Sequence, residues 1–168
     1  MEYLRAAGAA LIAVVFAVSS VSKLRDFRGF ARSVPALVPM PARWVTPVAL
    51  TVVVAEAGSA VLVVVPATAP AGFLLASALL LAFTAAIAAS LRRGRPAPCR
   101  CFGVSETPAG PRHLARNSVL LCLAVLGALA PETLPPLAGA VVACGAGVVV
   151  AVLVIAMDDI AVVFARSS

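Results

Sequence analysis

Two cysteines separated by one residue, Cys99 and Cys101, lie in the segment PAPCRCFGVSE (96–106), between two long uncharged stretches. Such a pair has three interpretations: two unrelated thiols, metal ligands, or a redox dithiol. Unrelated free cysteines are usually buried as small hydrophobic residues. That description fits Cys122 and Cys144, which lie inside apolar runs. It fits the pair poorly, because proline, arginine and glycine surround it.

A metal site at this segment would use Cys99, Cys101 and His113, the only histidine in the chain. Structural zinc normally takes four ligands, with cysteines spaced as Cys-x2-Cys. The set offers three ligands and a shorter spacing. We therefore predict no metal here.

A redox dithiol agrees best with the residues around the pair. A disulfide between Cys99 and Cys101 would close a small, strained ring, and strained disulfides are readily reduced. The attacking species in exchange is a thiolate, which nearby positive charge stabilises. Arg100 lies between the thiols, and Gly103 permits a tight turn that keeps the sulfurs accessible. Three further arginines precede the pair: Arg92, Arg93 and Arg95.

A second group of interest is Glu56, the one charge deep within the apolar runs. An ionised carboxylate in a membrane interior is costly, so this side chain is predicted to be protonated, paired, or facing a polar cavity. Lys23 and Arg25, at the end of the first apolar run, are the candidate partners. The alternative is a neutral Glu56 that is hydrogen-bonded within the bundle and serves packing alone.

Composition indicates the surroundings in which these groups must be placed. Hydrophobic residues make up 62% of the 168 residues and charged residues 12%, with a mean hydropathy of +1.09. Soluble domains carry about 25% charged residues. Lipid must therefore contact most of this surface. Backbone groups in lipid must be satisfied internally, which predicts an all-α integral membrane helical bundle.

Apolar runs predict four to five transmembrane helices in a single membrane domain over residues 1–168. A helix needs about 20 residues to cross the hydrocarbon core. The first run is long enough if Arg5 snorkels outward, and the fourth if it is counted from Arg112 with Arg116 directed toward the headgroups. The N-terminal run imitates a signal peptide, but four more runs follow, which favours a retained helix. The runs are Ala6–Ser22, Val45–Pro66, Pro70–Leu91, Asn117–Pro131 and Thr133–Met157.

Basic residues gather in two of the predicted connections, 23–43 and 92–116, which hold eleven of the thirteen lysines and arginines. The positive-inside rule places both connections in the cytoplasm. The arginines are not interleaved with aromatic residues, so the lipid bilayer and not a nucleic acid is the predicted partner. The chain is expected to be a multi-pass protein of a bacterial-type cell membrane.

The string CRCFG (99–103), followed by HLARNSVLL (113–121), resembles the MauE family of methylamine-utilisation membrane proteins. SSVSKLRDFRGF (19–30), and Glu56 followed by Gly58, are similar to a pattern that MauE shares with DoxX-like proteins. The resemblance covers about residues 10–130. An extra C-terminal helix is expected at about 134–157.

The resemblance implies a membrane protein of thiol–disulfide chemistry. MauE supports maturation of the disulfide-rich small subunit of methylamine dehydrogenase, alongside a thioredoxin-like partner. By motif position, the resemblance assigns the redox role to Cys99 and Cys101. Supporting positions, from the resemblance and from the residue types, are Arg100, Gly103, Glu56, Lys23, Arg116 and Asn117. Asn117 is also a candidate N-cap for the fourth span.

Two function hypotheses follow. In the first, the dithiol acts as a thiol-disulfide oxidoreductase that exchanges electrons with a thioredoxin-like protein and its client, with a membrane quinone as candidate cofactor. In the second, the chain is a non-catalytic membrane subunit that assists assembly or transport of a client protein. The resemblance and the charges disagree about the side of the membrane that the cysteines face. Oxidation of an exported protein, which the resemblance implies, needs the cysteines outside, and the positive-inside rule places them in the cytoplasm.

Overall fold

The computed structural model describes residues 2–94, 110–131 and 136–166, with side chains up to residue 157 in the last range. Its described residues form six helices and no strand, which confirms the predicted all-α fold. Five helices are long and apolar enough to cross a membrane: α1, α3, α4, α5 and the Leu137–Met157 part of α6. The helices are α1 (Glu2–Arg25), α2 (Phe27–Leu37), α3 (Ala42–Val64), α4 (Ala69–Arg92), α5 (Pro111–Leu129) and α6 (Leu137–Arg166).

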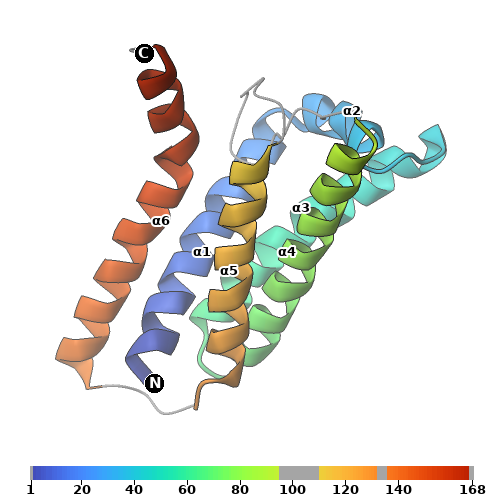
Figure 1. The fold of residues 1–168 in the computed structure, drawn as a ribbon. Coiled ribbons are helices and arrows are strands. Elements are labelled where there is room, and N and C mark those ends of the chain that lie inside the picture. The colour runs from blue at the N-terminus through green and yellow to red at the C-terminus, as the bar shows by residue number, and fades with distance from the viewer. Residues whose placement is uncertain (1, 95–109, 132–135, 167–168) are drawn as a thin grey trace.

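The long helices run side by side, with α1 packed against each of the others (Figure 1). α3 and α4 form a hairpin, α5 packs against α4, and α6 packs mainly against α1. The short α2 lies across one end of the bundle, against α3 and α4. Because the chain crosses five times, its N- and C-terminal ends lie at opposite ends of the bundle (Figure 1).

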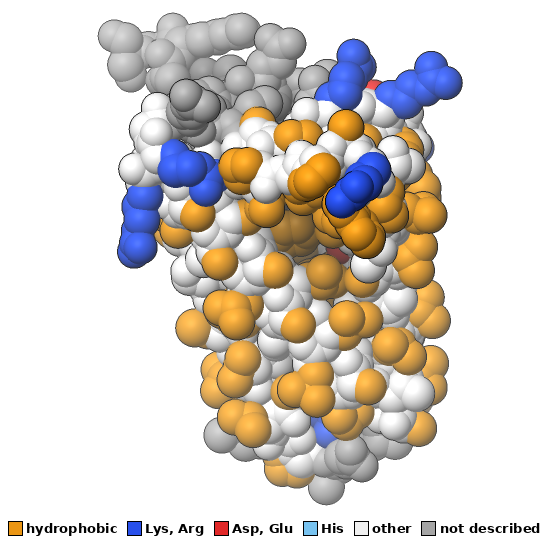
Figure 2. Space-filling view, turned by 90° about the vertical axis from the view of Figure 1, so that its right-hand side faces the viewer, with side chains coloured by type: hydrophobic (Ala, Val, Ile, Leu, Met, Phe, Trp, Pro, Cys, Tyr) orange, Lys and Arg blue, Asp and Glu red, His pale blue; other side chains and the backbone are white. Residues whose placement is uncertain are grey.

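Apolar side chains form both the core and the outer surface. Phe73 of α4, Ile12 of α1 and Leu120 of α5 are almost fully buried at the centre. Other large apolar side chains, such as Val54 and Leu81, face outward. Figure 2 shows this apolar belt over the middle of the molecule, with most of the basic side chains in view above it. This distribution matches a protein whose middle is solvated by lipid.

Helix α2 lies within the stretch that the sequence indicated as a connection between the first two spans. Phe30 and Val34, four residues apart, are buried against α3. The side chain of Asp26 caps the helix by accepting a hydrogen bond from the backbone N–H of Gly29 at 3.0 Å. Pro35 is accommodated in the last turn, and the helix ends at Leu37. The connection is therefore an amphipathic helix at the end of the bundle.

Two further boundaries differ from the predictions. Arg5 does not snorkel outward: it is 9% exposed, and its Nη1 donates a hydrogen bond to the carbonyl of Ala130 at 3.1 Å. The first span has sufficient length without it, because α1 begins at Glu2. At the other end, α6 continues past Met157 to Arg166. Charged residues end an apolar run, but they do not by themselves end a helix.

The α3–α4 hairpin depends on the absence of a side chain at Gly72. A Cβ atom built there would lie 2.5 Å from the backbone nitrogen of Val63. Small residues permit such close backbone approach between transmembrane helices. The turn is also fixed by the hydroxyl of Thr68, which donates to the carbonyl of Leu62 at 2.9 Å.

We predict that Gly72→Ala lowers the free energy of unfolding by about 1–3 kcal/mol, because the added methyl group meets backbone that cannot move aside. Unfolding by SDS in mixed micelles measures the effect. Gly58→Ala is the matched control, since a Cβ atom there meets nothing within 4 Å. Equal stability of the two variants would contradict the close packing.

Candidate functional site

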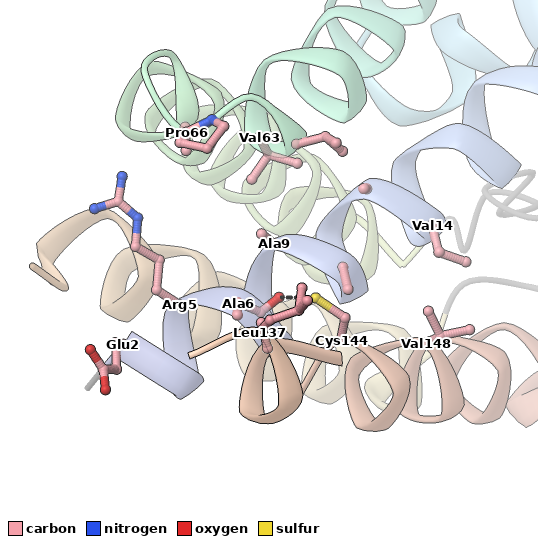
Figure 3. Close-up of a pocket in the computed structure, with 15 residues that line it drawn as sticks. Glu2, Arg5, Ala6, Ala9, Val14, Val63, Pro66, Leu137, Cys144 and Val148 are labelled. Carbon is pink, nitrogen blue, oxygen red and sulfur yellow. Dashed lines mark hydrogen bonds between the residues drawn. The ribbon is translucent and has the colours of Figure 1, made fainter. Parts of the chain in front are cut away.

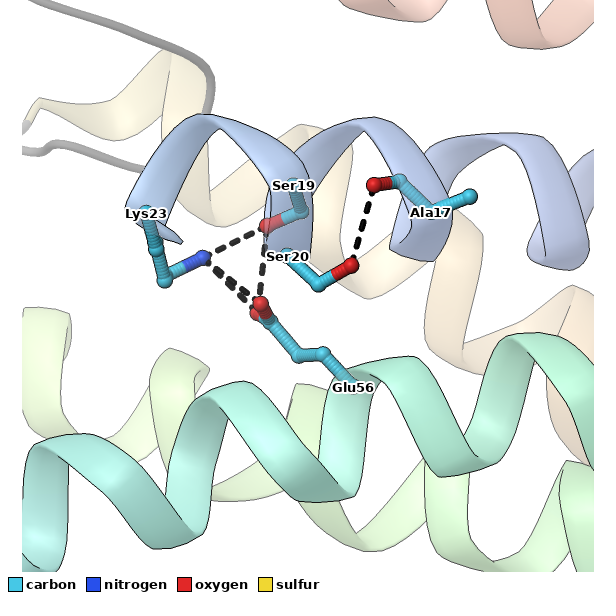
Figure 4. Close-up of polar contacts among 5 residues, drawn as sticks. All are labelled: Ala17, Ser19, Ser20, Lys23 and Glu56. Atoms are coloured by element: carbon cyan, nitrogen blue, oxygen red, sulfur yellow. Dashed lines mark hydrogen bonds and ion pairs between the residues drawn. The ribbon is translucent and has the colours of Figure 1, made fainter. Parts of the chain in front are cut away.

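A buried ion pair joins the first and second membrane-spanning helices (Figure 4). Lys23 Nζ lies 2.8 Å from Glu56 Oε1 and 3.0 Å from Glu56 Oε2, so the ammonium group contacts both carboxylate oxygens. The Ser19 hydroxyl donates to Oε1 at 3.1 Å and accepts a hydrogen bond from Lys23 Nζ. Glu56 is 1% exposed and Lys23 2%. Glu56 therefore faces the bundle interior, as predicted, and Lys23 rather than Arg25 is its partner.

Helix geometry places these groups together. Ser19 and Lys23 are four residues apart on α1, so their side chains lie on one face. Lys23 is in the last turn of α1, where the helix dipole favours a positive charge. Glu56 projects from the middle of α3, on the face that packs against α1. Ser19 was not predicted to take part in this site, although its spacing of four residues from Lys23 indicates that the two side chains share a face.

Two aromatic rings complete the surroundings of the ammonium group. Lys23 Nζ lies 5.4 Å from the ring centroid of Phe30 in α2 and 5.5 Å from that of Phe83 in α4. Ring faces attract cations at this distance. Four helices thus contribute to the site, and neither ring was assigned a role from the sequence. No sequence signal distinguishes them, because apolar residues on these helices are numerous.

A cavity of about 20 Å³ lies beside the ion pair, bounded by α1, α3, α4 and α5. Its polar lining consists of Ser19, Glu56 and Asn117, and the remaining walls are apolar. Asn117 is 4% exposed, and its Nδ2 has no hydrogen-bond partner among the described residues. A cavity of this volume is large enough for one water molecule, and the three polar side chains offer it hydrogen-bonding partners. The arrangement extends the polar site from the ion pair to α5.

The beginning of α5 differs from the sequence prediction. Asn117 is not the N-cap, because the helix begins at Pro111 and Gly110 occupies the cap position. His113 Nδ1 accepts a hydrogen bond from the backbone N–H of Gly110 at 3.2 Å. Arg116 does not point to the headgroups: it is 5% exposed, inside the bundle. Arg116 and Asn117 therefore belong to the second turn of α5 and face the interior.

The predicted redox residues Cys99 and Cys101, with Arg100 and Gly103, lie outside the described residues. Their segment is joined to the ends of α4 and α5, at the same end of the bundle as α2 (Figure 1). Gly94 has a φ of 64°, a conformation that commonly terminates a helix at glycine.

The other two cysteines lie in separate spans, as expected, but one of them is not buried. Cys122 of α5 is exposed on the outer surface of the bundle. Cys144 of α6 is half-buried, and its thiol lies 3.7 Å from the carbonyl oxygen of Ala6. The interpretation as buried small hydrophobic residues is therefore wrong for Cys122, because lipid rather than protein satisfies an apolar side chain there.

The family model of methylamine utilisation protein MauE matches residues 1–130. The chain belongs to the MauE family. A relative named methylamine utilization protein MauE, from Paracoccus denitrificans, is 40% identical over 121 residues, which are 68% of this chain and 62% of that protein. The chain thus matches less than two thirds of the relative's length. No solved structure matches the chain.

The MauE match covers all the helices that build the ion pair, α1 to α4, together with α5. Helix α6 begins at Leu137, after the matched region ends. The polar site therefore belongs to the part of the chain that is similar to the family. Contacts made by α6 belong to the remainder.

We predict that removing one member of the ion pair is more damaging than removing both. Lys23→Met leaves a carboxylate buried without its counter-ion, which should lower the free energy of unfolding by about 3–5 kcal/mol. The double variant Lys23→Met/Glu56→Met buries no charge and should recover much of that loss. A double-mutant cycle by SDS unfolding measures the coupling. Additive effects of the two single changes would contradict the buried pair.

Proposed function

We propose that this MauE-family protein exchanges electrons through a dithiol–disulfide couple at Cys99 and Cys101, in support of methylamine utilisation. The printed name of the Paracoccus relative supports the metabolic context, and the residue types around the cysteines support the chemistry. The main support for the proposal is the position of the cysteine segment in the chain. The cysteine segment joins the end of α4 to the beginning of α5, at the end of the bundle where α1 ends after Lys23 and where α2 lies.

The proposed reaction is a thiol–disulfide exchange with a thioredoxin-like protein. The thiolate of one cysteine attacks the partner's disulfide, forming a mixed disulfide and releasing one partner thiolate, which takes up a proton. The second cysteine then attacks its neighbour's sulfur, and the other partner thiolate is released and protonated. Two electrons and two protons pass to the partner, and Cys99 and Cys101 are left as a disulfide. The reverse sequence reduces the disulfide of Cys99 and Cys101 and oxidises the partner. The partner can then pass its disulfide on to a client protein.

Positive charge near the segment favours the thiolate form of its cysteines. Arg93, at the end of α4, donates a hydrogen bond to the carbonyl of Leu37 at the end of α2. Arg92 and Arg112 are exposed on either side of the segment, at the ends of α4 and α5. These arginines lie within a few residues of the segment's ends, so they contribute to its potential whichever way it folds.

The ion pair has a positioning role in this proposal. Lys23 and Glu56 hold α1 against α3, and the rings of Phe30 and Phe83 tie α2 and α4 to the same ammonium group. Since α4 carries one end of the cysteine segment, loss of the pair should change how the segment is presented to a protein partner. Arg100, Gly103, Arg116 and Asn117 support the same segment and the beginning of α5.

A membrane quinone remains the candidate cofactor of this proposal, because a dithiol–disulfide couple needs a second electron carrier to return it to its starting state. The proposed electron exchange with the thioredoxin-like partner takes place at the bacterial plasma membrane.

We predict that Cys99 and Cys101 resist alkylation together under oxidising conditions and become modified together after mild reduction, as read by mass spectrometry. In Cys99→Ser or Cys101→Ser the remaining thiol should react without reduction, because its disulfide partner is gone. Cys122→Ser is the matched control and should leave the protection intact. Modification of both thiols in the oxidised wild type would overturn the redox proposal and favour a non-catalytic assembly subunit.

The same experiment on intact spheroplasts establishes the side of the membrane. A thiol reagent that does not cross membranes should label the reduced pair only if the segment faces outward, where exported proteins fold. Labelling only after permeabilisation would place the exchange in the cytoplasm, as the distribution of basic residues predicts.

A further inference from the structure

An apolar groove of about 570 Å³ lies between α1, α6 and the turn that joins α3 to α4 (Figure 3). Small residues of α1, including Ala6, Ala9 and Ala13, form its floor. Val63 and Val64 of α3 form one wall, and Ala140 and other residues of α6 form the opposite one. The volume is in the range of sites that bind small apolar molecules.

The depth of the groove matches one leaflet of a membrane. Along α1 its lining extends from Glu2 to Val14, and along α6 from Leu137 to Val148. At 1.5 Å per residue these stretches span about 18 Å and about 16 Å. Half of the hydrocarbon core is about 15 Å thick. The groove thus runs from a helix end to about the middle of the membrane, which is the depth that one acyl chain occupies.

Two side chains of opposite charge, Arg5 and Glu2, lie at one end of the groove, and their charged groups point away from each other (Figure 3). Arg5 donates one hydrogen bond, from Nη1 to Ala130, and a guanidinium carries five N–H donors. Donors therefore remain for a phosphate group. The Glu2 carboxylate is half-buried and matches an ammonium group. One positive and one negative side chain at the same end of the groove complement a headgroup that carries both a phosphate and an amine.

We propose that the groove binds one acyl chain of a phospholipid from the leaflet at the N-terminal end of α1, and that its headgroup is phosphoethanolamine. Arg5 contacts the phosphate, and Glu2 contacts the amine. The wall formed by α6 lies beyond residues 1–130, whereas the lining from α1, α3 and the beginning of α4 lies within them, so only one wall of the site falls outside the family match. The proposal is independent of the redox chemistry at the other end of the bundle.

The first test fills the groove. Wild type, Ala140→Phe, Val64→Phe and Ala82→Phe are purified from bacterial membranes in mild detergent, and native mass spectrometry counts retained phospholipid. Ala140 and Val64 lie on opposite walls, and Ala82 is exposed on α4, away from the groove. We expect one retained phosphatidylethanolamine in wild type and Ala82→Phe, and its loss in both groove variants. Equal retention in all four proteins would overturn the proposal.

The second test examines the headgroup and does not depend on the groove variants folding. Delipidated wild type is titrated with phosphatidylethanolamine or phosphatidylglycerol in nanodiscs. One hydrogen bond to a charged group contributes about 1.5–3 kcal/mol, so the amine-bearing lipid should bind about tenfold or more tightly. Glu2→Gln should remove this preference while leaving acyl-chain binding. Equal binding of the two lipids by wild type would overturn the assignment of the headgroup.

Discussion

The buried contact between Lys23 and Glu56 is the interaction on which the arrangement of α1 to α4 depends. Two opposite charges lie within the apolar part of the bundle, each almost fully removed from solvent. Either charge alone would be strongly unfavourable there, so any arrangement of α1 and α3 that separates them is excluded by several kilocalories per mole. The rings of Phe30 and Phe83 add α2 and α4 to the same contact. One pair of side chains thereby fixes the relative rotation of the helices around it.

This constraint matters more in lipid than it would in water. Lipid tails are as apolar as the helix surfaces, so hydrophobic burial does not favour one pairing of helices over another. Specific pairing must come from polar contacts and from close fit. Both occur here, at different levels of α3: the ion pair at Glu56 in its middle, and the backbone contact between Val63 and Gly72 near the α3–α4 turn. Together they determine how α1, α3 and α4 cross, and α5 then packs into the angle between α1 and α4.

The sequence was sufficient to predict the spans and the inward orientation of Glu56, because both follow from the cost of placing charge or unpaired backbone in lipid. The sequence was insufficient where a group inside the protein pairs with the polar side chain, because the free-energy cost of burying that side chain is then reduced. Arg116 was expected to point toward the headgroups but is buried, and Arg5 is only 9% exposed because it donates a hydrogen bond to the carbonyl of Ala130. Asn117 was expected to cap α5, but the helix begins six residues earlier. Helix α2 was hidden because its apolar residues are spaced for an interfacial helix, and prolines on either side of its end suggested a connection.

The two ends of the bundle carry different chemistry, and the ion pair explains why they need not interfere. Lys23 and Glu56 cancel each other's charge within the apolar region, so the pair adds no net charge that would perturb either end. At the basic end, the exposed Arg92 and Arg112 lie at the ends of α4 and α5, where the proposed redox segment begins and ends. At the other end, α6 contacts mainly α1 and leaves a groove beside α3 and α4. Because α6 takes no part in the ion pair, the α6 wall of that groove can adjust to an occupant while the pair holds α1 against α3.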